Sequence, residues 1–109
     1  MRQFRTVEEG IEDYFRVHPD EIDDYLTEVF QEYAQDNDTG ALLASLRVIA
    51  RVRGVNQLAG SVGLSRQGLQ KALSSDGNPR LGNITAIMRA MGYCLLPQKL
   101  PPTPLSSPQ

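Results

Sequence analysis

Apolar residues recur at every third or fourth position over most of the chain, which is the spacing of one face of an α-helix. The first such pattern predicts a helix over about 7–17, and Thr6 with Glu9 matches a capping box at its start. A second pattern, after Pro19, predicts a helix over about 20–35. Its apolar positions are Ile22, Tyr25, Leu26, Val29, Phe30 and Tyr33.

The segment "QDNDTG" then interrupts the helical pattern. Its acids and its glycine faintly resemble the start of a calcium loop, but Arg47 stands where the closing carboxylate should be. We therefore interpret the segment as a turn and a helix cap, and not as a metal site. A third helix is predicted over about 41–53, with Gly54 as its C-terminal stop. Its inward-facing residues are Leu42, Leu46 and Ile49.

Two short helices joined by a turn are predicted next. The first covers about 56–62, with Asn56 able to cap it, and the second covers about 65–73, with Ser65 as its cap. Gly63 stands where the turn between them needs a left-handed backbone. The apolar residues that would hold the pair against a third helix are Leu58, Val62, Leu64, Leu69 and Ala72, beside the small Ala59. This spacing is typical of a helix-turn-helix, and the competing interpretation is a purely structural helical pair.

The outer face of the second short helix is polar and contains no acid. It carries Arg66, Gln67, Gln70 and Lys71. Arginine can bind guanine and glutamine can pair with adenine in the major groove, where the first residues of a recognition helix meet base edges. Gly68 has no side chain to hold the helix away from the groove, which would offset its helix cost of about 1 kcal/mol. The alternative is that Gly68 packs tightly against another helix.

The C-terminal third combines one more helix with loops. "SSDGNPR" has the composition of a loop, and a last helix is predicted over about 81–91, ended by Gly92. Its predicted buried residues are Leu81, Ile84, Ile87, Met88 and Met91. "YCLLP" is compatible with a short C-terminal strand. Residues 97–109 hold five of the seven prolines and are predicted to be a disordered tail.

Charge divides the chain into two parts. Its 109 residues suit one domain, and 40% hydrophobic with 22% charged residues is normal for a soluble protein. Residues 1–40 carry three Arg against twelve Asp and Glu, whereas residues 41–93 carry six Arg and one Lys against Asp76 alone. The basic part would suit a polyanion, and solvation alone is the other interpretation. Candidate phosphate contacts are Arg47, Arg51, Arg53, Arg80 and Arg89, with Arg80 first because it lies in the loop that leaves the recognition helix.

Other features argue against a membrane protein, an exported protein or an enzyme. No apolar run approaches the roughly 20 residues of a membrane span, and the N-terminus lacks the apolar core of a signal peptide. Cys94 is the only cysteine and is predicted to be a buried structural thiol, while His18, the only histidine, is predicted to lie at the surface. No phosphate-binding glycine loop or Cys/His metal spacing occurs. We therefore expect a cytoplasmic protein without a catalytic site, metal or cofactor.

The motif residues also resemble a known family. "VNQLAGSVGLSRQGLQKAL" followed by "DGNPRLGNITAIMRAMGY" is similar to the helix-turn-helix antidote (antitoxin) proteins of addiction modules, in the lambda-repressor-like class. The resemblance spans roughly 20–97, and the loop 74–79 is its most distinctive part. It implies operator DNA, the protein's own promoter, and a small toxin of the RelE/ParE type as partners. The helix before residue 19 and the proline-rich tail depart from the family pattern.

The sequence thus predicts an all-α, lambda-repressor-like domain of five to six helices. Its parts are an N-terminal extension (1–18), a helix-turn-helix domain (19–96) and the tail (97–109). We expect a homodimeric, sequence-specific DNA-binding regulator, whose copies meet through "YCLLP" or through the N-terminal helices. The predicted DNA-binding residues are Ser65, Arg66, Gln67, Gln70, Lys71 and Arg80. The alternative is a protein-interaction module whose acidic N-terminal helices bind a basic partner, with the helix-turn-helix as scaffold.

Overall fold

The structure, a computed structural model, describes residues 6–74, 77–100 and 102. These residues form α-helices and one short 3-10 helix, and no strand occurs among them. The elements are α1 (Val7–Val17), η1 (Pro19–Glu21), α2 (Ile22–Asp36), α3 (Thr39–Arg53), α4 (Val55–Val62), α5 (Arg66–Ala72) and α6 (Leu81–Ala90). The all-α prediction is confirmed, whereas the segment 93–97 is not a strand. Of the proline-rich tail, the structure describes residues 97–100 and 102, and these lie in no helix or strand.

Local sequence accounts for the start of the fold. Thr6 Oγ1 accepts a hydrogen bond from Glu9 N at 3.0 Å, and Glu9 Oε1 accepts one from Thr6 N at 3.0 Å. The predicted capping box is therefore present, and it satisfies two backbone donors that the helix leaves free. Pro19 begins the 3-10 turn η1, so the second long helix starts at Ile22, two residues later than predicted.

The turn after α2 matches its interpretation as a cap. Asn37 has a left-handed backbone with φ 55°, which ends α2. Asp38 Oδ1 then accepts a hydrogen bond from Ala41 N at 3.1 Å and caps α3, and Asp36 Oδ1 accepts one from Asp38 N at 2.8 Å. The carboxylates of this segment thus bind backbone donors of the turn itself.

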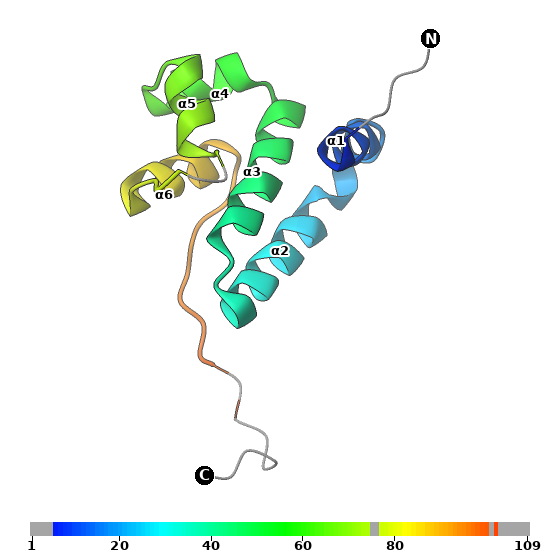
Figure 1. Ribbon diagram of the computed structural model, residues 1–109, viewed down its shortest axis with the longest axis vertical. Coiled ribbons are helices and arrows are strands. Elements are labelled where there is room, and N and C mark those ends of the chain that lie inside the picture. The colour runs from blue at the N-terminus through cyan, green and yellow to red at the C-terminus, as the bar shows by residue number, and fades with distance from the viewer. Residues whose placement is uncertain (1–5, 75–76, 101, 103–109) are drawn as a thin grey trace.

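Helix α3 is the centre of the core. Figure 1 shows α1 and α2 on one side of α3, with α4, α5 and α6 on the other. Leu43, Leu46 and Ile49 of α3 are at most 1% exposed. Burying a side chain of this size contributes about 1.5–3 kcal/mol. Leu81 was predicted to be buried but is 74% exposed, because it occupies the first position of α6, outside the packed part of that helix.

The segment after α6 turns back past α3 toward α2 (Figure 1). Gly92, with φ 98°, makes this reversal. Tyr93 and Leu95 pack partly against the core, while Cys94 and Leu96 are exposed, as expected for an extended backbone whose side chains alternate. The prediction of a buried Cys94 is therefore wrong. Within the described residues, every helix is too short or too polar to cross a membrane.

Candidate nucleic-acid interface

The junction between α4 and α5 follows directly from its residues. Gly63 ends α4 with a left-handed backbone, φ 75° and ψ 25°, as predicted. Leu64 N donates to Ala59 O at 2.9 Å, which closes the turn. Ser65 Oγ accepts a hydrogen bond from Gly68 N at 2.9 Å and caps α5, so the predicted cap is confirmed.

Buried leucines set the orientation of α5. Leu69 and Leu73 are each 1% exposed and point into the core, while Leu64 packs partly against it. Because residues four apart share one face of a helix, these two leucines direct the opposite face of α5 toward solvent.

The outward face of α5 carries the predicted binding residues. All of them are exposed: Ser65, Arg66, Gln67, Gln70 and Lys71. Arg66 Nη1 donates a hydrogen bond to Asn56 Oδ1 at 2.9 Å, which ties the guanidinium to α4. Asn56 was predicted to cap α4, but the helix begins at Val55 after Gly54, and the Asn56 amide lies in the first turn instead. Sequence reasoning therefore missed the role of Asn56 as the residue that holds Arg66.

Gly68 has a local structural explanation. A Cβ at this position would lie 3.1 Å from Ser65 Oγ and 3.8 Å from Leu64 Cβ. The glycine thus leaves room for the hydroxyl that caps α5. The atoms that a Cβ would crowd belong to the turn just before α5 and not to another helix.

Arg80 is exposed beside the loop that leaves α5. It occupies the position before α6, where its carbonyl accepts from Ile84 N at 3.1 Å and its side chain makes no cap. Gly77 allows this loop to pass close to α5, since a Cβ at residue 77 would lie only 2.8 Å from Lys71 O. Residues 75 and 76 lie outside the described part of the chain.

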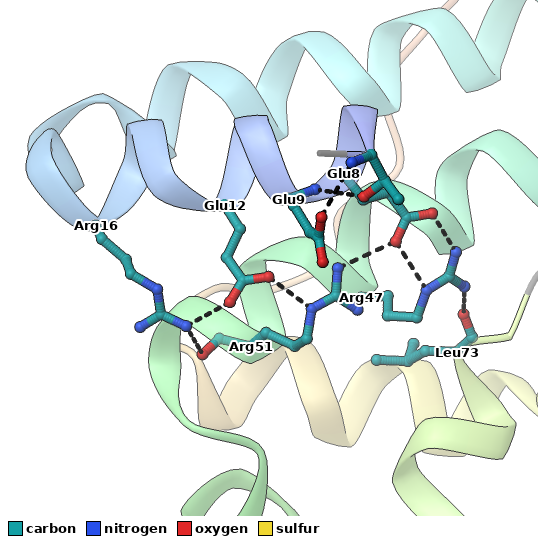
Figure 2. A network of polar contacts seen from close by, with 8 residues as sticks. Glu8, Glu9, Glu12, Arg16, Arg47, Arg51 and Leu73 are labelled. Carbon is teal, nitrogen blue, oxygen red and sulfur yellow. Dashed lines mark hydrogen bonds and ion pairs between the residues drawn. The ribbon is translucent and has the colours of Figure 1, made fainter. Parts of the chain in front are cut away.

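Two of the arginines considered as phosphate contacts are bound to α1 instead. Figure 2 shows Arg47 and Arg51 of α3 facing Glu8 and Glu12. Arg47 Nη2 lies 2.6 Å from Glu8 Oε2, Arg51 Nη2 lies 3.1 Å from Glu8 Oε1, and Arg51 Nε lies 2.8 Å from Glu12 Oε1. This α1–α3 ion-pair network also includes Arg16, which pairs with Glu12. Two arginines of the basic part are therefore paired with two glutamates of the acidic part.

The network extends to the end of α5. Arg47 Nη1 donates to Leu73 O at 2.5 Å, the carbonyl that ends this helix (Figure 2). A hydrogen bond from Arg47 lowers the pKa of the Glu8 carboxyl. Burial raises the pKa of Glu12, but hydrogen bonds from Arg51 and Arg16 outweigh it, so this pKa is also below its usual value. Both carboxylates are thus held in their charged form.

Sequence reasoning did not find the network, although a signal was present. Glu8 and Glu12 are four residues apart, and so are Arg47 and Arg51. Two helices that carry opposite charges at the same spacing can pair in register. Only the packing of α1 on α3 shows that they do.

The comparisons with known proteins identify the family. Residues 7–98 match a family model described as "Probable addiction module antidote protein". The chain belongs to this family. The match starts at the first residue of α1, so this helix is part of the antidote family pattern and not an addition to it.

This antidote also has a relative in Haemophilus influenzae, which is described only as "Uncharacterized protein". The two are 40% identical over 72 residues, which cover 66% of this chain and 70% of that protein. No solved structure matches the antidote. The antidote family implies a toxin partner of some kind, and such families are typically non-enzymatic.

Proposed function

We propose that this antidote is a sequence-specific DNA-binding regulator that represses the promoter of its own toxin-antitoxin module. In this proposal, α4 and α5 act as a helix-turn-helix of the lambda-repressor-like class, and α5 enters the major groove. The exposed polar face of α5 carries the proposal. Its two cations, Arg66 and Lys71, are exposed, and Arg66 is bonded to the neutral amide of Asn56 and not to a carboxylate.

The residues of this face have distinct proposed roles. Arg66 binds guanine as a bidentate donor, and Gln67 and Gln70 read adenine. The bond to Asn56 holds Arg66 in place, which reduces the side-chain entropy lost on binding. Ser65, Lys71 and Arg80 complete the surface, with Arg80 bound to phosphate, which positions the protein without reading sequence.

A homodimer is part of the proposal. Helix α5 is seven residues long and reads too few base pairs for useful specificity by itself. Two copies would read half-sites about 34 Å apart, or a multiple of that distance. The toxin would be of the RelE/ParE type, and both proteins would act in the cytoplasm.

A gel-shift assay with the DNA upstream of the antidote gene tests the proposal. We expect a complex that forms with this DNA and not with scrambled DNA, and whose affinity falls steeply between about 50 and 200 mM salt. If no complex forms even at the lower salt concentration, regulation is excluded and the protein-interaction interpretation is left.

Three arginine variants assign the roles within the interface. Arg66→Ala should reduce the discrimination between bases at one position of the site by about 1–3 kcal/mol. Arg80→Ala should instead lower the affinity for all DNA sequences alike and reduce the salt dependence of binding. Arg16→Ala is the matched control, because this arginine is also exposed but lies on α1, on the other side of α3 from α5 (Figure 1). If neither Arg66→Ala nor Arg80→Ala differs from the control, the assignment of both residues is wrong.

A further inference from the structure

Two hollows flank the outer side of α2. The first, about 590 Å³, lies between α2 and the segment 93–98, with Leu26, Phe30 and Met88 among its lining residues. The second, about 520 Å³, lies between α2 and the end of α1, where Phe15 and Tyr25 line it. The two hollows form one continuous surface because they share lining residues of α2.

A ridge on α2 separates the hollows. Thr27 and Gln31 line both of them and are exposed. On the far side of the first hollow, Leu96 is 78% exposed. The Tyr93 hydroxyl donates to Asp23 and ties the C-terminal segment to α2, which holds this wall in place.

The α2 surface is acidic. No Lys or Arg lines either hollow within the described residues, whereas Asp23 lines the first, and Glu21, Asp24 and Glu28 line the second. The sequence has no Lys or Arg from residue 17 to residue 46. Some cations adjoin lining residues without lining the hollows: Arg53 donates to the Tyr93 hydroxyl, while Arg16 follows Phe15 and Lys99 follows Gln98 in the sequence.

These acids differ from those of α1. Glu8 and Glu12 are paired with arginines of α3, whereas the acids of α2 form no ion pair with any described residue. The fold thus pairs Glu8 and Glu12 with arginines and leaves the carboxylates of α2 exposed at the surface. A surface with apolar hollows and unneutralised carboxylates is complementary to a segment with apolar and cationic side chains.

We propose that the two hollows along α2 are the docking surface for a cationic protein segment, which in this antidote belongs to the toxin. Apolar side chains of the segment enter the hollows on either side of Gln31, and its Lys or Arg side chains meet the surrounding carboxylates. The inference rests on the proposed antitoxin function.

The charge distribution argues against the other occupants. A second copy docked symmetrically through α2 would place the same acids opposite one another, and like charges across an interface disfavour association. A nucleic acid or an anionic membrane would be repelled for the same reason. Because α3 lies between α2 and α5, a segment docked here leaves the face of α5 accessible (Figure 1).

The first experiment uses the full chain and a pair of defined peptides. One is an amphipathic helix of Leu and Lys, and the other has Glu at every Lys position. Cys94 is the only cysteine, is exposed and lines the first hollow, so its alkylation by the neutral reagent iodoacetamide reports occupancy. The Lys peptide should slow alkylation in a saturable manner, and the Glu peptide should leave the rate unchanged.

Two pairs of variants locate the peptide. Gln31→Lys should lower the affinity for the Lys peptide by up to about fivefold, which is the scale of one exposed charge pair. Gln35→Lys is its control, because it adds the same charge to α2 away from the hollows. Leu96→Ser should also weaken binding, and Leu81→Ser is its control, because both leucines are highly exposed. The proposal is overturned if the Lys peptide gives no protection, if both peptides protect equally, or if each control weakens binding as much as its partner.

Sedimentation and gel-shift measurements separate this inference from the proposed function. If Gln31→Lys converts a wild-type dimer to a monomer, a second copy covers α2 and the docking proposal is wrong. If the peptide protects Cys94 but the protein binds no operator DNA, only the proposed regulatory function fails. If DNA binding is intact and protection is absent, only the docking surface fails.

Discussion

Replacing Glu8 by Gln tests the α1–α3 ion-pair network with almost no change in shape. Glu8 accepts hydrogen bonds from Arg47 Nη2 at 2.6 Å and from Arg51 Nη2 at 3.1 Å, and its side chain is 35% exposed. After the substitution, Arg47 keeps its bond to Leu73 O and Arg51 keeps its bond to Glu12. The variant therefore loses two ion pairs without leaving either guanidinium unbonded.

The size of the effect follows from the exposure of these pairs. Partly exposed ion pairs contribute about 0.2–1 kcal/mol each, so we expect Glu8→Gln to lower the free energy of unfolding by about 1 kcal/mol at pH 7. For a domain of this size, such a loss lowers Tm by about 4–8 °C. Thermal and urea unfolding, followed by circular dichroism, measure both quantities.

The pH dependence distinguishes an ion pair from a packing effect. Arg47 lowers the pKa of Glu8 below its ordinary value of 4.5, so the folded state binds this proton more weakly than the unfolded state. The stabilisation is then fully present above pH 4.5 and is lost as the pH falls through the lower pKa of the folded state. The difference between wild type and Glu8→Gln should shrink over this acidic range.

Glu32→Gln provides the matched control, since Glu32 is exposed on α2 and the substitution removes the same charge. The reasoning is refuted if Glu8→Gln destabilises the protein no more than Glu32→Gln at pH 7. An undiminished difference at acidic pH would equally show that charge pairing is not the cause.

Three further substitutions test the packing and the turn of the α4–α5 pair by urea unfolding. Ser65→Ala removes the hydroxyl that caps α5 and should cost about 1 kcal/mol, and an unchanged midpoint would show that the cap contributes nothing. Leu69→Ala should cost about 2–5 kcal/mol because Leu69 is 1% exposed, whereas Leu81→Ala, at a position 74% exposed, should change stability by less than about 0.5 kcal/mol. Gly63→Ala should lower the free energy of unfolding by about 1 kcal/mol or more, because Gly63 has a left-handed backbone with φ 75°. Gly60 has an ordinary helical backbone, so an equal loss of stability in Gly60→Ala would contradict this reason.

The α1–α3 network bears on how the charge of this chain is interpreted. The sequence shows an acidic part followed by a basic part, which suggests two separate binding surfaces. In the fold, Glu8 and Glu12 neutralise two arginines of the basic part. Exposed charge remains on α5 and on α2, and these are the two surfaces for which we propose partners.

Some features of the candidate site were predictable because they depend on neighbouring residues alone. The capping box at Thr6, the left-handed Gly63 and the cap at Ser65 each involve groups within a few residues of one another. The outward face of α5 was also predictable, since Leu69 and Leu73 lie on its opposite side at helical spacing.

Other features could not be predicted because they depend on which helices meet. Arg47 binds Glu8, 39 residues away, and Arg66 binds Asn56, whose sequence context also suits a helix cap. The exposure of Cys94 depends on how the last segment crosses the core, and composition alone suggested burial.

The sequence by itself determined, to within about two residues, where the helices of this protein begin and end, and it determined which side of each is apolar. Those properties follow from hydrogen bonds and side-chain spacing within one or two helical turns. Only the tertiary structure decided which charges are neutralised and where hollows remain. Ion pairing and burial are set by atoms brought together from distant parts of the chain, and the packing of α1 and α2 on α3 supplies those neighbours.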